Sequence, residues 1–307
     1  MKCKNTAALG LAAALIASGA SAQGLAEGLE VEGFIDLAGI YSNGNSELYF
    51  SGDVTVGTRF GGGPFGVALG IEAYAADGDT ISALYPMFTY STDFGDFTIG
   101  RPRFVLDTLV DVPAIAGAAW IWGQEVALGT RSFGGLTVLL EDPGDLNFAG
   151  LRYDGDYGDL RVSAAYHRLW DAGTDANMYS IGLGYRIGAT ELVAGVETLR
   201  DGGDLTSFII GATYDEGPLS AGLLYSGVEL GPDNINVLLL WTGYEVMDGL
   251  TVTGTYRDFI NEDDARVFGL DAEYIYASGA YTGVGVGVQD SGVGSEEFFV
   301  FDIGLRF

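Results

Sequence analysis

The chain has 307 residues, with 14 Lys and Arg against 42 Asp and Glu and a formal net charge of −28. This charge excludes nucleic-acid binding, which depends on clustered basic residues. An apolar content of 48% excludes the disorder that acidic chains often show. With 49 Gly, 17 Tyr and 17 Phe but 7 Pro, the composition favours an all-β protein.

The first 22 residues have the pattern of a secretory signal peptide. Two lysines precede an apolar stretch at residues 7–17 and an Ala-Ser-Ala cleavage site at residues 20–22. The apolar stretch is shorter than the about 20 residues of a spanning helix. We therefore expect a mature chain of residues 23–307, a single domain with 12 Arg, no Lys and 42 acids, hence a charge of −30. Cys3 lies in the leader, so the mature chain has no thiol.

Apolar and polar residues alternate through most of the mature chain. In residues 179–187, for example, Tyr and aliphatic residues take every second position, and Ser, Gly and Arg lie between them. A period of two predicts β-strands with one apolar and one polar face. Tight Gly-containing turns alternate with longer acidic connections. The pattern predicts 16–18 antiparallel strands, and our count favours 18.

The apolar face is predicted to contact lipid, with a soluble sandwich as the alternative. About 285 residues in one array are many for a sandwich, and the polar face carries Arg and Glu in mid-strand, as a watery lumen would. A sheet in lipid must close on itself, since no edge can stay unpaired. Aromatic residues near segment ends are typical of interfacial girdles. They are Tyr41, Phe60, Tyr90, Tyr256 and Phe259.

The last segment keeps its apolar row up to the final residue. Its apolar residues are Phe299, Phe301, Ile303, Leu305 and Phe307. We expect them to form the lipid face of a strand that pairs with the first strand, Glu30–Tyr41, and closes a transmembrane β-barrel. A terminal strand that ends in Phe resembles the assembly signal of bacterial outer-membrane barrels. For Phe307, this resemblance implies recognition by the barrel-assembly machinery.

Residues 104–122 do not alternate. Their sequence, FVLDTLVDVPAIAGAAWIW, is the longest connection and is apolar, so we expect it to fold into the barrel and pack on the inner wall. The preceding DFTIGRPRF resembles the end of the fifth strand of general diffusion porins, whose third loop folds inward and narrows the pore. The strand expected at Glu125–Phe133 resembles the next porin strand. With the leader, the hairpins and the terminal Phe, the resemblance covers nearly the whole chain.

In general diffusion porins, wall arginines face carboxylates on the third loop. A transverse field between such opposed charges orients polar solutes. Matched position by position, the resemblance implies that Arg59, Arg101 and Arg131 are the wall arginines and that Asp107 and Asp111 are the loop acids. The alternative is that these residues are ordinary solvated lumen charges.

Arg101 raises a geometrical problem, because it shares the parity of Phe97 and Ile99. Strict alternation would turn its charge toward lipid, at a cost of about 2–4 kcal/mol in mid-membrane. A bulge, or the end of the strand near Gly100, would turn it inward. Arg103 is the other candidate for this role.

The resemblance implies a Gram-negative outer-membrane porin. Such a protein is a water-filled homotrimeric channel for passive diffusion of ions and small hydrophilic solutes, in contact with lipid and lipopolysaccharide. The excess of acids predicts a preference for cations. Eighteen strands would favour a substrate-specific porin instead, for example for sugars. Trp120 and Trp122 could then be stacking residues, and packing against the barrel wall is the other interpretation of these two residues. A non-conducting structural or adhesive barrel is the third hypothesis.

No enzyme is predicted. The mature chain has one His and no Cys, too few for a hydrolase triad or a Cys/His metal cluster. By alternation, His167 is expected to be a solvated lumen residue. No cofactor is expected, apart from Ca²⁺ that acidic outer loops could bind or bridge to lipopolysaccharide phosphates; a solvated rim is the other interpretation. These loop acids are Asp201, Asp204, Asp233, Glu262, Asp263, Asp264, Glu296 and Glu297.

Overall fold

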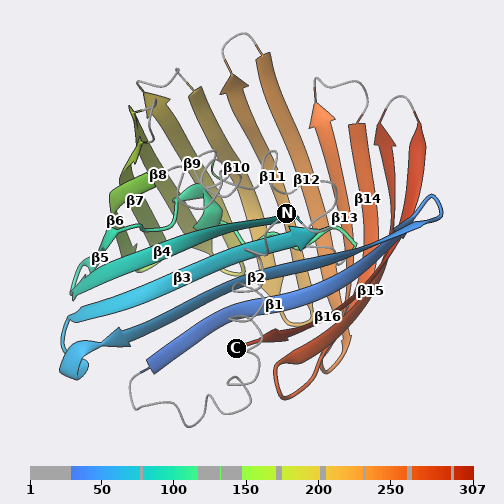
Figure 1. The fold of residues 1–307 in the computed structure, drawn as a ribbon, viewed down its shortest axis with the longest axis horizontal. Helices are drawn as coiled ribbons and strands as arrows, with labels where there is room; N and C mark the ends of the chain where they lie inside the picture. The colour runs from blue at the N-terminus through green and yellow to red at the C-terminus, as the bar shows by residue number, and fades with distance from the viewer. Residues whose placement is uncertain are drawn as a thin grey trace.

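The protein forms a closed antiparallel β-barrel (Figure 1). The structure, a computed structural model, describes residues 29–76, 79–116, 132, 147–170, 175–200, 205–230, 233–260, 265–291 and 294–307. Within these ranges, none of the helices is long and apolar enough to cross a membrane.

The described residues form sixteen strands and two short 3₁₀ turns, η2 (Phe60–Gly62) and η3 (Leu106–Thr108). The strands are β1 (Leu29–Ser42), β2 (Asn45–Arg59), β3 (Phe65–Ala76), β4 (Asp79–Thr92), β5 (Gly95–Gly100), β6 (Asn147–Tyr157), β7 (Leu160–Trp170), β8 (Asp175–Ile187), β9 (Thr190–Arg200), β10 (Leu205–Glu216), β11 (Leu219–Leu230), β12 (Asp233–Met247), β13 (Leu250–Ile260), β14 (Ala265–Ile275), β15 (Ala280–Ser291) and β16 (Ser295–Arg306).

Each strand pairs with its neighbours in sequence, and β1 pairs with β16 to close the ring. The closing ladder runs from Phe34 opposite Arg306 to Ser42 opposite Phe298. Beyond it, Gly33 and Phe307 exchange two backbone hydrogen bonds, of 3.1 and 3.3 Å. The predicted pairing of the first and last strands is therefore confirmed.

The favoured count of 18 strands is wrong. In the described residues, β5 pairs directly with β6, with Phe97 opposite Tyr153, and the ring closes with sixteen strands. Of the expected strand Glu125–Phe133, Ser132 is the one described residue and it is not in a strand; the strand that follows β5 in the ring is Asn147–Tyr157. Alternation alone does not show that a segment joins the barrel, because a strand must also find a neighbouring strand whose edge is unpaired.

The outer face is apolar, as alternation predicts. Phe299, Phe301 and Ile303 on β16 are 45–47% exposed, whereas Phe298 and Val300, at the alternate positions, are buried. β15 follows the same rule with valines outward and glycines inward. This outer face of large apolar side chains is what a membrane-spanning barrel presents to lipid.

One girdle assignment is wrong. Tyr41, Phe60 and Tyr90 are exposed as expected, but Phe259 is 6% exposed and belongs to an apolar cluster with Ile115 and Ala116. On β13, Phe259 shares the inward parity of buried Thr255 and Arg257. Its position near a strand end does not decide its face; the pleat does.

A charge on the outer face should destabilise this barrel more than the same charge in the lumen. Phe301→Arg, near the middle of β16, is expected to lower the free energy of unfolding by about 2–4 kcal/mol, because the guanidinium would face lipid. The matched control is Thr253→Arg, which lines the internal cavity and should cost far less. Urea unfolding in lipid vesicles measures both, and equal losses would contradict the assigned faces.

Candidate pore lining

The chain leaves the barrel wall at Gly100, where β5 ends. Gly100 has a φ of +119°, and a Cβ there would lie 2.5 Å from the carbonyl oxygen of Pro86, so a side chain at this position would be strained. The Arg101 N–H donates to that same carbonyl at 2.9 Å. The Arg101 guanidinium then lies 5.0 Å from the centre of the Phe148 ring and donates to the Phe148 carbonyl at 3.1 Å. Because the strand ends here, the Arg101 side chain can lie against the inward-facing ring of Phe148.

Residues 104–116 pack on side chains of strands spread around the ring, in three clusters. Phe104 packs in the first cluster with Tyr85 and Phe148. Leu106 and Leu109 pack in the second cluster against β9, β10, β11 and β12. In the third cluster, Ile115 and Ala116 pack with residues of β1, β2, β12, β13, β14 and β16. This stretch is therefore fixed by apolar burial along its length.

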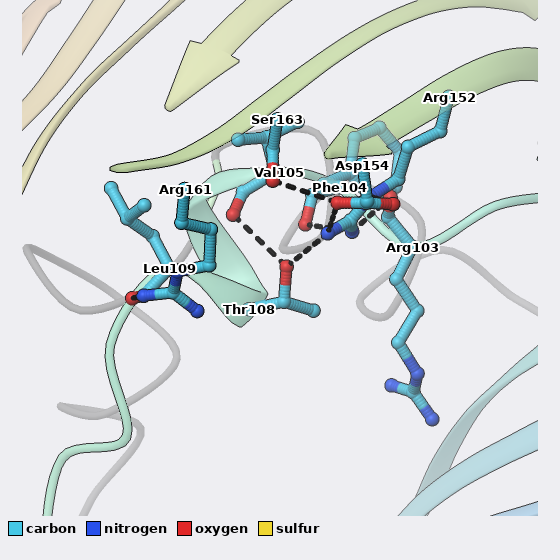
Figure 2. A network of polar contacts seen from close by, with 9 residues as sticks. All are labelled: Arg103, Phe104, Val105, Thr108, Leu109, Arg152, Asp154, Arg161 and Ser163. Carbon is cyan, nitrogen blue, oxygen red and sulfur yellow. Dashed lines mark hydrogen bonds and ion pairs between the residues drawn. The ribbon is translucent and has the colours of Figure 1, made fainter. Parts of the chain in front are cut away.

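Arg152 of β6 holds the start of this stretch (Figure 2). Its Nη1 donates to the Arg103 carbonyl at 3.2 Å, and its Nη2 donates to Thr108 Oγ1 at 2.8 Å. Asp154 accepts from two nitrogens of the same guanidinium, at 2.7–2.8 Å, and also accepts from Ser163 Oγ at 2.7 Å. A planar guanidinium suits this role, since it donates in several directions at once.

Arg161 of β7 holds the next turn in the same way (Figure 2). Its Nη2 donates to the Leu109 carbonyl at 2.9 Å and also to Glu191 Oε1 at 3.0 Å. Within the same stretch, Asp107 accepts a hydrogen bond from the Ser132 N–H at 2.7 Å, and the Ser132 hydroxyl donates to Glu197. Two wall arginines thus direct some of their donors to backbone carbonyls and others to a carboxylate.

Arg103 lies at the centre of a separate group of charged and aromatic side chains. It forms an ion pair with Asp53 and lies 3.7 Å from Glu72, with its guanidinium 4.7 Å from the centre of the Tyr85 ring. Tyr74 and Tyr85 both donate their hydroxyls to Glu72 at 3.1 Å. Burial alone would lower the pKa of Arg103, but the carboxylates of Asp53 and Glu72 outweigh it and raise that pKa above its ordinary value. The charge of Arg103 is therefore permanent.

Arg103, Asp53, Glu72 and Tyr74 border a cavity of about 1030 Å³ inside the barrel. Its lining comes from strands around the ring and from residues 103 and 107–114. The described lining contains ten Asp or Glu and four Arg. A passage with this surplus of carboxylates attracts cations and repels anions.

The predicted site residues divide into three groups. Arg103, Asp107 and Asp111 are among the lining residues. Arg59 ends β2 at an exposed position and donates to Ser91 Oγ at 2.8 Å, and Arg101 is held by Phe148 and Asn147; neither belongs to the described lining of the cavity. Arg131, Trp120 and Trp122 lie outside the described residues.

His167 differs from its expected environment. It is fully buried rather than solvated: its Nε2 lies 3.0 Å from the Pro102 carbonyl, and its ring stacks on Phe104 with a centroid distance of 4.2 Å. Alternation gives the inward direction correctly. It cannot show that a distant apolar stretch covers the side chain.

Most lining acids were not singled out from the sequence. They are Asp36, Asp53, Glu72, Glu191, Asp215, Asp271, Glu273 and Asp302. The sequence marks such residues as carboxylates at inward-facing positions in the middle of a strand, as Glu72 is between Ile71 and Ala73.

No group of three or more His, Cys, Asp or Glu is arranged to hold a metal ion in the part of the chain that the structure describes. The acidic connections 201–204 and 261–264 lie outside it. Calcium binding at the loop acids therefore stays a prediction.

A closed antiparallel barrel with an apolar outer face and a charged lumen has the architecture of an outer-membrane channel. The chain belongs to the Gram-negative porin family, whose model matches residues 6–294. It is thus a channel for passive diffusion in the bacterial outer membrane. The family and the fold are those of a channel rather than of an enzyme.

Solved porins share this fold. A triple mutant of Rhodopseudomonas blastica porin is 16% identical to this chain, with a TM-score of 0.70. The match covers 91% of this chain and 100% of the porin chain. A loop L8 deletion mutant of OmpT, an outer-membrane protein of Vibrio cholerae, is 16% identical with a TM-score of 0.64, covering 91% and 99% of the two chains. No curated protein sequence matches the chain.

The contacts of Arg152 predict a specific loss. Arg152→Ala is expected to lower the free energy of unfolding by about 2–3 kcal/mol, because it leaves Asp154 without its bidentate partner and releases the carbonyls that it holds. It should also make residues 101–116 more sensitive to protease. Urea unfolding measures the first effect and limited proteolysis measures the second, both on the refolded protein.

Arg168→Ala is the matched control. Arg168, on the neighbouring strand β7, pairs with Asp175, and both side chains are more than half exposed. Its loss should cost less than about 1 kcal/mol. Equal effects of the two substitutions would contradict an anchoring role for Arg152.

Proposed function

We propose that the chain is a general diffusion porin that favours cations, and that the 104–122 segment folds inward as the constriction loop. The proposed cation selectivity rests on the cavity lining, which contains ten carboxylates and four guanidinium groups in the described residues. The net charge of this lining is negative, because carboxylates remain in excess even if each arginine is paired with one of them. A solute therefore meets a polar, anionic passage rather than an apolar one.

The inward course of the loop is supported by the described part of it. Residues 104–116 contact strands on separate arcs of the ring, from β4 and β6 through β9–β12 to β14 and β16. Arg152 and Arg161 donate hydrogen bonds to the carbonyl oxygens of Phe104 and Leu109 in this stretch. A segment on the outer surface could not reach these inward side chains.

The charge arrangement at the proposed constriction differs from the expected one. Arg103, on the loop side of Gly100, faces wall carboxylates of β2 and β3. Asp107 and Asp111 are the loop acids of the same lining. We therefore assign the constriction role to Arg103, Asp107 and Asp111 with Asp53 and Glu72, and leave Arg59 and Arg101 as structural residues; Arg131 stays a prediction.

Sixteen strands remove the reason to prefer a substrate-specific porin, which rested on a count of 18. We further propose a homotrimer in contact with outer-membrane lipid and lipopolysaccharide, assembled through recognition of the strand that ends in Phe307 and exported by the leader at residues 1–22. These proposals rest on membership of the porin family.

Planar-bilayer recording of the refolded mature chain tests the proposed function. In a tenfold KCl gradient, the reversal potential should have the sign of K⁺ selectivity, and current should rise with salt without saturating. Conductance steps in groups of three would support the trimer. A reversal potential that favours Cl⁻ would contradict cation preference, and the absence of conductance from correctly folded barrels would contradict the channel. Protein denatured by heat before addition is the control.

A further inference from the structure

One wall of the lumen carries half of the net negative charge of the described lining. The strands β1, β14 and β16 contribute Asp36, Asp271, Glu273 and Asp302 to the cavity lining, and the one Arg that they contribute among the described residues is Arg306. Elsewhere in the lining, Arg103 and Arg161 each form an ion pair with a carboxylate. The charges of this wall and those of the rest of the lining are therefore balanced differently.

The register of the sheet arranges these carboxylates in levels. Asp271 pairs with Gly285 of β15, and Glu273 pairs with Gly283, which also pairs with Asp302. One level further along, Asp36 pairs with Gly304 of β16, which pairs with Tyr281. Successive inward levels are two residues apart, or about 7 Å along the strands. Carboxylates thus occupy three consecutive levels over about 14 Å.

Small residues let these side chains lie along the wall. A Cβ on Gly283 would lie 2.1 Å from Asp302 Oδ1, and a Cβ on Gly304 would lie 2.3 Å from the Tyr281 hydroxyl. A Cβ on Gly285 would lie 1.9 Å from the carbonyl oxygen of Ala116. The line of carboxylates therefore begins directly beside Ala116, the last described residue of the 104–122 segment.

Two of these carboxylates are not fully satisfied by the protein. Glu273 accepts from Arg306 at 2.8 Å, and Asp36 accepts from the Tyr281 hydroxyl at 3.0 Å. In contrast, Oδ1 of Asp271 and Oδ1 of Asp302 accept no hydrogen bond from the described part of the chain, although these residues are 9% and 3% exposed. A carboxylate so deeply buried is costly without a partner. Both residues border the cavity.

We propose that Asp271, Asp302 and Asp36 form a carboxylate track along which cations move past the constriction loop, and that this track determines the cation selectivity of the channel. The inference rests on the proposed function. Its ligand is a small monovalent cation such as K⁺, held weakly at successive levels. Carboxylates spread over three levels suit brief, repeated contacts, which permit conduction, better than one tight site. The absence of a three-carboxylate metal group among the described residues agrees with this.

Charge-neutral variants test the track. Asp302→Asn and Asp271→Asn keep the size of the side chain and remove its charge. In a tenfold KCl gradient, each should lower the K⁺/Cl⁻ permeability ratio by about twofold, and the double variant by more. Conductance in molar KCl should change little, because salt screens the lumen and the pore is no narrower.

Asp175→Asn is the matched control. It removes the same charge from an exposed ion pair with Arg168, and Asp175 is not among the described lining residues. Its permeability ratio should equal that of the unmodified protein. If the lumen variants also leave the ratio of a conducting, cation-selective channel unchanged, the track is refuted and the proposed function stands. If the unmodified protein does not conduct or prefers Cl⁻, the proposed function fails first.

Discussion

Closure of the hydrogen-bonded ring is the constraint on which the rest of this structure depends. Lipid offers no partners to a free strand edge, so β1 must pair with β16 throughout the membrane. Each pairing around the closed ring sets the register of its two strands, and the register fixes which residues face inward. The three carboxylate levels on β1, β14 and β16 follow directly from it. A shift of one residue would turn Asp302 and its neighbours toward lipid and bring Phe301 into the lumen.

The lumen is shaped by a second, opposite requirement. Inward apolar residues such as Phe148, Leu224 and Val300 would face water in an empty barrel, and residues 104–116 cover them. Arginines of β6 and β7 then hold the carbonyl oxygens of this stretch, which has little regular secondary structure to hold them itself. Apolar packing and arginine anchoring fill part of the lumen, and the charged cavity is what remains beside it.

The sequence predicts faces better than it predicts partners. A period of two was enough to place Phe299 and Phe301 outward, His167 inward and the last strand beside the first. It was not enough to show that Phe104 would bury His167, or that Phe259 would pack on Ile115, because those contacts join segments far apart in the chain. The strand count failed for the same reason: whether a segment enters the ring depends on which edge is free, and β5 is already paired with β6. Similarly, the carboxylates of β14 and β16 are recognisable as a group only once the register is known.

The position of the stretch after Gly100 inside the barrel is the claim on which the pore assignments depend. A Cβ on Gly182 would lie 2.7 Å from Cγ1 of Val105, close to the separation between a sulfur and the far Cβ in a disulfide. The mature chain is expected to contain no other cysteine, so the double variant Val105→Cys/Gly182→Cys provides a direct test. We predict that mild oxidation crosslinks the two positions in vesicle-embedded protein and that the crosslinked barrels still conduct K⁺. Failure to crosslink in a barrel that folds and conducts would contradict this position, because Val105 would not then lie against the inner wall of β8.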